Sequence, residues 1–262
     1  MNRDNDNMYV KSLLLILSVV GWLSVCAQEL PKIGKDDYII RHAAYTLLYN
    51  KEKNCPDWVA WKLTKEHLKG NISRKNNDFQ GDPDIDVEYR VTPYEYKKSG
   101  YDRGHMCPAG DNKWSSVAMK ECFYMTNMCP QTSTLNQRWW NNLENACRRW
   151  AQKEDTLYIC CGPIYEGETF KTIGGRYNYS QKRKGIKVFV PTGFYKVVLS
   201  LKKGREKAIG FVYDNDDSHQ PMSEKYMTVD EVEKLTGLDF FADLEDELEE
   251  RVENTCNISD WK

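Results

Sequence analysis

The stretch Ser99-Gly100-Tyr101-Asp102-Arg103-Gly104-His105 carries the strongest signal in this chain, and Asn136 and Glu144 follow it. A neutral imidazole such as that of His105 suits a general base, because its ordinary pKa is about 6.5. The guanidinium of Arg103 can bind two phosphate oxygens at once. Asn136 offers an amide oxygen, a neutral ligand that suits Mg²⁺. Hydrolysis of a phosphodiester needs such groups: a base for water, and cations for the phosphoryl oxygens.

Each of these residues has a simpler explanation when it is taken alone. A single histidine such as His105 is more often structural than catalytic. Asn136 stands where a helix is expected to begin, and asparagine there is more often an N-cap. In an α-helix Glu144 lies about 80° further round than Asn136, on an adjacent face. By itself, Glu144 fits a solvated helix acid equally well.

The composition is that of a globular protein. Of 262 residues, 40% are hydrophobic and 12% aromatic, which excludes a disordered or low-complexity chain. The length allows one large domain or two small ones. The sequence contains no linker or internal repeat, so we predict one domain. A formal net charge of -2 excludes a uniformly basic nucleic-acid-binding protein.

The charge is nevertheless distributed unevenly. Residues 171–207 contain 11 Lys and Arg against one Glu, whereas residues 214–253 contain 15 Asp and Glu against three basic residues. The basic block fits an electrostatic footprint for a polyanion. On charge alone, a solvated strand face balanced by a solvated, acidic C-terminal helix is favoured.

The N-terminus indicates export. Residues 12–25 read SLLLILSVVGWLSV, which is shorter than the roughly 20 residues of a membrane span, and Val25-Cys26-Ala27 resembles a signal-peptidase site. We predict a signal peptide over residues 1–27, with Met1 or Met8 as its start, and a periplasmic or secreted domain over residues 28–262. The alternatives are an uncleaved anchor and a lipoprotein with Cys26 lipidated. Once the signal is removed, we predict no stable membrane partner unless Cys26 is lipidated.

The cysteines agree with export. Cleavage after Ala27 leaves eight of them, an even number that indicates disulfides in an oxidising compartment. A zinc site is disfavoured, because the chain contains no C-x-x-C pair. The tripeptide His105-Met106-Cys107 does not fit a zinc deaminase, since no Pro-Cys-x-x-Cys follows it.

The spacing of apolar residues predicts an α+β fold with a largely antiparallel sheet. The strongest helix is predicted over residues 136–152, and Asn54-Cys55-Pro56-Asp57 is predicted to be a turn. Thr228 and Glu231 form a capping box for a helix that Gly237 ends. Shorter helices are predicted at residues 115–121 and 243–250, and strands at residues 45–49, 59–63, 156–161, 186–190, 194–201 and 208–213.

Several separated motifs resemble one family, in the same order along the chain. They are residues 99–109, Asn127-Met128 with Pro130-Gln131, residues 136–140, residues 161–165, residues 190–196 and residues 233–241. From about residue 42 to residue 241 the chain resembles the DNA/RNA non-specific endonuclease family, the ββα-metal (His-Me finger) nucleases. The resemblance implies a ββα-metal nuclease fold, in which helices flank a central, largely antiparallel sheet.

The resemblance also implies the roles of the residues that perform the chemistry. His105 matches the general base of the family. Asn136 matches the direct ligand of the metal, Mg²⁺ or alternatively Mn²⁺, and Glu144 matches a residue that holds a metal-bound water. Asn127 is implied to support His105 or the metal-binding loop through hydrogen bonds, although an amide that only stabilises the loop explains it equally well.

Three arginines are implied to bind the substrate. Arg103 and Arg74 match the cationic clamp on the phosphate, and Arg138 is a further substrate contact. The match of Arg74 is looser, so a surface ion pair stays open for it. Asp102 is interpreted as a structural residue of the motif, and Gly104 as a requirement of the backbone.

The chain departs from the family pattern at a few positions. Gln137 and Trp139 stand where the family has Arg and Gly, which changes contacts to the substrate but keeps the ligand Asn136. Cys107 follows the base closely and is a candidate for a disulfide there. Neither departure removes a residue that the chemistry needs.

The sequence thus predicts an exported, Mg²⁺-dependent endonuclease that cleaves DNA and RNA with little base preference, because it binds phosphates and not base edges. Family analogy implies a metal-stabilised 3′-oxygen leaving group and a 5′-phosphate product. DNA and RNA are the predicted partners, and a homodimer is compatible with the prediction. Two alternatives stay open. One is a catalytically silent nucleic-acid-binding protein on the same fold, and the other is a phosphodiesterase for small nucleotides, which needs no basic track.

Overall fold

The computed structural model describes residues 30–75, 77–180 and 182–261. The predicted signal peptide lies outside the described residues and stays a prediction. Within these ranges, none of the helices combines the length and the apolar character that crossing a membrane requires.

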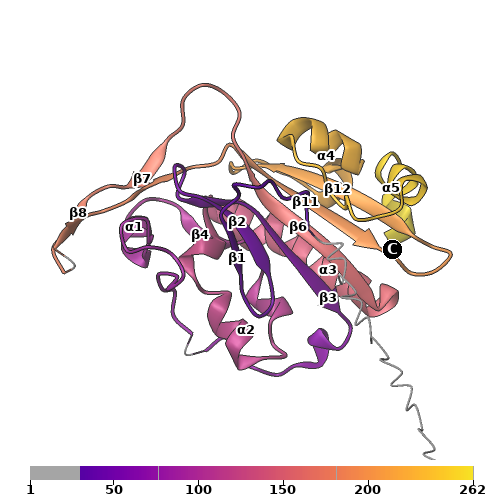
Figure 1. Cartoon of the computed structure of the whole chain (residues 1–262), viewed down its shortest axis with the longest axis horizontal. Helices are drawn as coiled ribbons and strands as arrows, with labels where there is room; N and C mark the ends of the chain where they lie inside the picture. Colours follow the sequence, from indigo (N-terminus) through magenta and orange to yellow (C-terminus); the bar gives the residue numbers. More distant parts are fainter. Residues whose placement is uncertain (1–29, 76, 181, 262) are drawn as a thin grey trace, which may run out of the picture.

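A seven-stranded antiparallel sheet forms the centre of the molecule (Figure 1), with the strand order β1-β2-β3-β6-β11-β12-β13. β11 (Gly193–Ser200) pairs with β6 (Thr156–Ile164) on one side and with β12 (Lys207–Asp214) on the other. β6 also pairs with β3 (Cys55–Thr64), the longest strand. The sheet is completed by β1 (Ile39–Arg41), β2 (Thr46–Asn50) and β13 (Tyr226–Met227).

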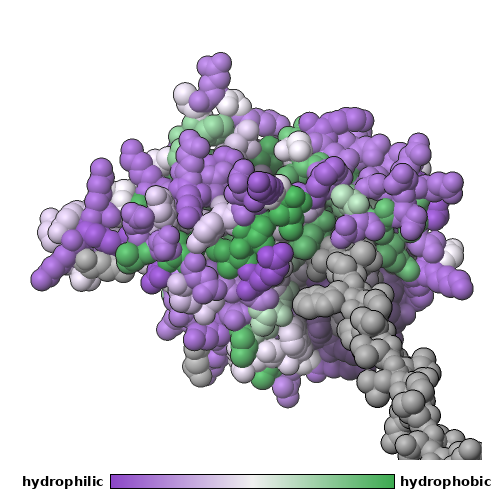
Figure 2. Space-filling model, in the orientation of Figure 1, coloured by the Kyte–Doolittle hydropathy of each residue, from purple (hydrophilic) through white to green (hydrophobic). Residues whose placement is uncertain are grey.

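Both faces of the sheet are covered, because its central strands are apolar on both sides. Cys160 and Cys161, neighbours on β6, belong to different buried clusters, since successive strand residues point to opposite faces. The larger cluster includes α3 (Asn141–Glu154), and the smaller one includes α4 (Val229–Thr236) and α5 (Asp246–Glu253). Figure 2 shows that hydrophilic side chains cover most of one outer face, around a hydrophobic patch near its middle.

A ββα unit on the α3 face builds the candidate site. β4 (Asp102–His105) pairs antiparallel with β5 (Met128–Gln131), and the chain then enters a π-helical segment (Leu135–Trp140) that continues as α3. The short helices α1 (Pro93–Tyr96) and α2 (Ser116–Glu121) flank this unit (Figure 1). Gly104 is required here by packing, because a Cβ on it would lie 2.1 Å from Oε1 of Gln131. The unit and the antiparallel sheet confirm the predicted fold.

An arm extends from the body between β6 and β11 (Figure 1). It consists of β7 (Thr172–Gly174), β8 (Tyr177–Asn178), β9 (Arg183–Lys184) and β10 (Lys187–Phe189), in which β7 pairs with β10 and β8 with β9. The chain therefore runs out along the arm and back.

The predicted basic block is not one continuous surface. Its first part lies on the arm, whereas Lys196 is buried within β11. Lys202 and Lys207, around the turn between β11 and β12, form ion pairs with Asp155 and Glu154. The exposed part of the basic block is therefore divided between the arm and the turn between β11 and β12, where Lys203 and Arg205 are exposed.

Most predicted elements are confirmed, and two local predictions are wrong. The turn predicted at residues 54–57 lies earlier, because Cys55 and Pro56 already pair with β2. Asn54 ends the turn with φ 56°, a left-handed conformation that asparagine tolerates. The helix predicted from residue 136 starts as a π-helical segment, which the 3.6-residue periodicity did not indicate.

Candidate active site

Most of the predicted site residues meet in one cavity of about 560 Å³. β4 contributes His105 and Arg103, the π-helical segment contributes Asn136, and α3 contributes Glu144. Arg74 reaches the same cavity from the segment that precedes α1. The structure thus brings together an imidazole, two guanidinium groups, an amide and a carboxylate from separate parts of the sequence.

His105 is fixed by its backbone and by two aromatic rings. Nε1 of Trp140 donates a hydrogen bond to its carbonyl oxygen at 3.1 Å. The imidazole lies against Phe79 and Phe123, with ring centroids 5.4 and 5.1 Å away. Among the described residues its Nε2 has no hydrogen-bond partner. Nε2 itself is buried, but the residue as a whole is partly exposed and lines the cavity, so its imidazole can meet a molecule there.

The surroundings of His105 keep its imidazole neutral. Burial, followed by the positive charges of Arg74 and Arg103, lowers the pKa of His105 to about 3. The ring is therefore unprotonated at neutral pH, as a general base must be. A bound phosphate would offset the two guanidinium charges and make the ring more basic.

Asn136 lies inside the helix and not at its N-cap. Its backbone N–H donates to the carbonyl oxygen of Thr132 at 2.9 Å, and its Nδ2 donates to Oδ2 of Asp102 at 3.0 Å. The N-cap explanation is therefore wrong, because a capping side chain accepts a hydrogen bond from the first turn. With its nitrogen held by Asp102, the amide presents its oxygen as the atom that can bind a metal.

Asp102 orients the start of the helix. Nε2 of Gln137 donates to the same Oδ2 at 2.9 Å. Burial raises the pKa of Asp102, but the hydrogen bonds from Asn136 and Gln137 outweigh this effect and keep the pKa below its usual value. The structural role predicted for Asp102 is thus to accept hydrogen bonds, as a carboxylate, from the side-chain amides of Asn136 and Gln137.

The π-helical segment explains how Glu144 reaches the cavity. One extra residue in a helical turn moves all later residues back by about 100°. In a regular α-helix, Glu144 would lie roughly 80° further round than Asn136. The backward rotation largely cancels this separation, so both side chains line one cavity.

The side-chain oxygens of Asn136 and Glu144 are of the type that suits a hard divalent cation. Burial raises the pKa of Glu144 to about 7, although the positive charges of Lys196 and Arg148 oppose this. Nη2 of Arg148 lies 4.0 Å from Oε2 of Glu144, whereas its Nη1 lies 2.8 Å from Oδ1 of Asp111. The carboxylate of Glu144 is thus only partly neutralised by its neighbours. A cation held near it and the amide oxygen of Asn136 would supply the missing charge.

Arg74 and Arg103 stack on the rings that hold His105. The guanidinium carbon of Arg103 lies 4.3 Å from the ring centre of Phe79, and that of Arg74 lies 5.5 Å from the ring centre of Phe123. Stacking uses the flat face of the guanidinium, so its N–H edge remains for phosphate oxygens. Both arginines are exposed at the cavity, as a substrate clamp requires.

Two other predicted residues lie outside this cavity. Asn127 is buried, and its Nδ2 donates to the carbonyl oxygens of Cys107 and Cys122, while its Oδ1 accepts from the N–H of Cys107, each at 2.8 Å. These bonds fix the loop that follows His105, which favours the loop-stabilising role. Arg138 is exposed, with its guanidinium carbon 4.4 Å from the ring centre of Trp139.

The described cysteines differ from the prediction of disulfides. No disulfide joins any two of the eight cysteines among the described residues, and seven of them are buried. They are distributed over both faces of the sheet, and several have hydrogen-bond partners of their own. The thiol of Cys122 donates to the carbonyl oxygen of Met119, and that of Cys107 accepts from Nδ2 of Asn112. The cysteines therefore act as small core residues.

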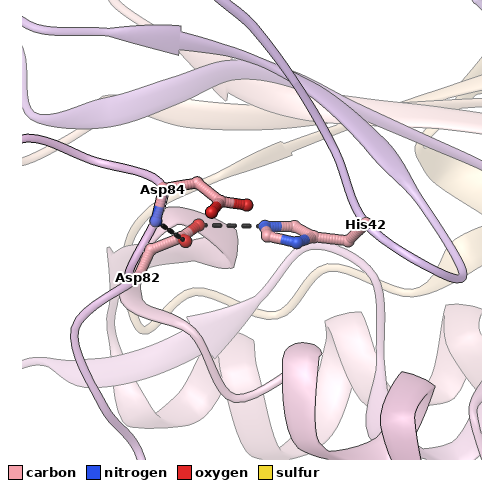
Figure 3. Close-up of side chains that lie close together, drawn as sticks. All are labelled: His42, Asp82 and Asp84. Carbon is pink, nitrogen blue, oxygen red and sulfur yellow. Dashed lines mark hydrogen bonds and ion pairs between the residues drawn. The ribbon is translucent and has the colours of Figure 1, made fainter.

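A second group of ligand-type side chains lies outside the cavity. Figure 3 shows His42, Asp82 and Asp84, whose ligand atoms lie within 4.8 Å of one another. Nε2 of His42 and Oδ2 of Asp82 are 2.9 Å apart, and Oγ1 of Thr126 donates to the same oxygen at 2.5 Å. The other oxygen of Asp82 accepts from the N–H of Asp84. Both oxygens of Asp82 thus have hydrogen-bond partners, and the group joins the three chain segments that carry His42, Asp82 and Thr126.

The sequence analysis missed the residues that support the site. Phe79 and Phe123 position the imidazole and the guanidinium groups, but isolated phenylalanines carry no signal of this role. Lys196 is buried, with its Nζ 4.7 and 4.5 Å from the ring centres of Trp61 and Trp140. The sequence did contain an indication of this role, because a lysine is rare within an otherwise apolar strand.

Residues 26–247 match the DNA/RNA non-specific endonuclease family. The chain belongs to this family. It is 34% identical to Nuclease C1 of Cunninghamella echinulata var. echinulata over 215 residues, which cover 80% of this chain and 84% of that protein. Human mitochondrial endonuclease G is 33% identical over 200 residues, covering 75% of this chain and 67% of the relative.

The fold of this family member also matches a solved structure. A crystal structure described as the EndoG/EndoGI complex superposes with a TM-score of 0.74 and 29% sequence identity. The match covers 84% of this chain and 90% of the other. The two proteins thus share the ββα-metal nuclease fold over most of their length.

Proposed function

We propose that this protein hydrolyses phosphodiester bonds of DNA and RNA, with His105 as general base and Asn136 as metal ligand. Membership of the family supports the endonuclease activity. The observation that carries the assignment of roles is the partly exposed His105, which lines the same cavity as Arg74, Arg103 and Asn136.

The residues of this chain divide the work as follows. Arg74 and Arg103 bind the phosphoryl oxygens and bring the phosphate beside the imidazole. The neutral imidazole of His105 accepts a proton from the attacking water. Phe79, Phe123 and the Trp140 hydrogen bond keep the ring in place, so the base does not have to be ordered during the reaction.

Mg²⁺ is the proposed cation, with Mn²⁺ as a substitute. Asn136 would hold it directly and Glu144 through a bound water, and Asp102 would orient the amide. When bound, the ion supplies charge that stabilises the leaving 3′-oxygen. Amide and carboxylate oxygens are the ligands that such hard cations prefer.

A second cavity favours a long polymer over a small nucleotide as substrate. It has a volume of about 470 Å³, and Asp102 and Arg103 line it as well as the first cavity. Lys97 and Lys98 line it too, and Arg176 of the arm lies over Tyr94 at its edge, 5.8 Å from the ring centre. These cationic side chains lie one after another between His105 and the arm, as binding to a long phosphate backbone requires.

Export remains part of the proposal, on the strength of residues 12–27 alone. The mature chain would then begin at Gln28 and act in the periplasm or outside the cell. Mass spectrometry of protein recovered from the export route would show Gln28 at its N-terminus, whereas an acylated Cys26 would replace this proposal by a lipoprotein.

Incubation of the purified protein with supercoiled plasmid and with structured RNA tests the activity. We expect both to be degraded in Mg²⁺ and both to survive in excess chelator. Binding without cleavage in Mg²⁺ and in Mn²⁺ would instead support the catalytically silent alternative. Cleavage confined to dinucleotides would support a small-nucleotide phosphodiesterase.

A further inference from the structure

Three carboxylates from two helices meet far from the candidate active site. Asp230 and Glu233 lie one turn apart on α4, and Glu253 is the last residue of α5. One oxygen of each lies within 4.8 Å of the others. Figure 1 shows α4 and α5 beside β12, whereas β4 and α2 lie on the other side of the sheet. We call Asp230, Glu233 and Glu253 the α4–α5 cluster.

Glu253 is the unusual member of the α4–α5 cluster. Only 6% of its surface is exposed, and among the described residues its Oε1 has no hydrogen-bond partner. It also lies at the C-terminal end of α5, where the helix dipole disfavours a negative charge. An unpartnered, buried carboxylate oxygen lacks the ligand that would offset its loss of water.

The surroundings of Glu253 add to this deficit of positive charge. The carboxylates of Glu233, Glu249, Asp230 and Asp239 all lie close enough to act on Glu253 with negative charge. The nearby Lys32 is exposed and pairs with Asp239 at 3.1 Å, outside the cluster.

The free oxygens suit a cation of a particular size. One oxygen of Glu233 accepts a hydrogen bond from the N–H of Phe240 at 2.7 Å, which fixes that carboxylate and leaves its other oxygen. Ca²⁺ binds oxygens at about 2.3–2.6 Å, so two of its ligands are at most about 5 Å apart. The spacing within the cluster falls inside this limit.

We propose that the α4–α5 cluster binds a divalent cation of the Ca²⁺ type, which joins the two helices. Carboxylate oxygens are hard ligands, and Ca²⁺ accepts them in flexible geometry, whereas Mg²⁺ requires a near-ideal octahedron. The cation would be structural, because the cluster shares no residue with the cavity around His105. The inference does not rest on the proposed nuclease function.

Thermal unfolding of the full chain, in Ca²⁺ and in chelator, tests this site. Glu253→Gln and Asp230→Asn each remove one ligand charge, and Glu250→Gln is the matched control, because Glu250 is an exposed acid on the same helix α5. With Ca²⁺ at about 100 times its Kd, we expect the Tm of the wild type and of Glu250→Gln to rise by about 5–10 °C. Glu253→Gln and Asp230→Asn should lose most of that rise.

A calorimetric titration with Ca²⁺ alone supplies the second readout. We expect the wild type to bind one Ca²⁺ more than Glu253→Gln, which should also be at least as stable as the wild type in chelator. An equal Tm rise in all four proteins would place Ca²⁺ elsewhere and overturn the proposal. If Ca²⁺ did not raise the Tm of the wild type, the proposal would also be overturned, and the carboxylates of the cluster would be held together by shared protons. Neither readout uses nuclease activity.

Discussion

Oδ2 of Asp102 accepts a hydrogen bond from Nδ2 of Asn136 at 3.0 Å, across the junction between β4 and the helix. The bond determines which end of the amide is available to a metal. It also couples the strand that carries His105 to the helix that carries Asn136 and Glu144. Together with the bonds from Gln137 to Asp102 and from Trp140 to His105, it fixes His105 relative to Asn136 and Glu144.

Removal of this contact should weaken metal binding more than substrate binding. In Asp102→Ala the amide of Asn136 is free to rotate, so we expect the Mg²⁺ concentration for half-maximal plasmid cleavage to rise by about 10- to 100-fold. The rate at saturating Mg²⁺ should fall much less. Asp86→Asn, at an exposed aspartate outside the cavity, is the control. An unchanged Mg²⁺ requirement in Asp102→Ala would show that Asp102 does not orient the ligand.

The pH dependence of cleavage should depend on Arg74. As the proposed general base, His105 would act only when it is neutral, and its lowered pKa of about 3 places the expected loss of activity at acidic pH, below the ordinary value of about 6.5. Arg74→Ala removes one of the charges that lower this pKa. The acidic limb of kcat/KM, measured at saturating Mg²⁺, should therefore move to higher pH.

Lys75→Ala is the control for Arg74→Ala, since Lys75 is exposed and does not line the cavity. A fall in rate without movement of the acidic limb would mean that Arg74 acts on the phosphate and not on the base. A movement to lower pH would contradict the electrostatic explanation of the His105 pKa.

The arm should contribute salt-dependent affinity for long nucleic acids. Lys182 and Lys184 are its exposed lysines next to β9, and their double substitution by Ala should weaken binding to long duplex DNA. It should also reduce the slope of log K against log salt by about 2, because two phosphate contacts are lost. The control, Lys202→Ala with Lys203→Ala, removes two charges at the opposite end of the sheet. Equal slopes in all three proteins would exclude the arm from binding.

The cysteines should react as buried free thiols. Burial raises the pKa of Cys122 and Cys147 to about 12 and that of Cys161 to about 11, so few thiolates form at pH 8. We expect iodoacetamide to modify the partly exposed Cys256 first. All eight cysteines beyond Ala27 should become reactive after unfolding without a reductant. If a reductant were needed to expose them, disulfides would be present after all.

Local patterns were sufficient for most of the fold. The alternation of apolar residues predicted the long strands, and the Thr228 capping box predicted α4, because these signals lie within a few neighbouring residues. The order of the family motifs predicted that His105, Asn136, Glu144 and Arg103 meet, and they do.

Features that depend on distant contacts could not be predicted in this way. The bond between Asp102 and Asn136 joins residues 34 positions apart. The stacking of Arg103 on Phe79 depends on the folding of the intervening chain. The cysteine count indicated disulfides because a count contains no distances, whereas among the described residues the cysteines are core residues that form no disulfide with one another.

Plasmid cleavage by His105→Ala, beside Asn136→Ala and the exposed control Asn142→Ala, tests the central claim most directly. In preparations free of other nucleases, we expect His105→Ala to bind DNA normally but to cleave it at least about 10²- to 10⁴-fold more slowly. Added imidazole should restore part of that rate, and extra Mg²⁺ should not. Asn136→Ala should respond in the opposite way, because water can replace one neutral ligand. Near-wild-type cleavage by His105→Ala would contradict the assignment of His105 as the general base.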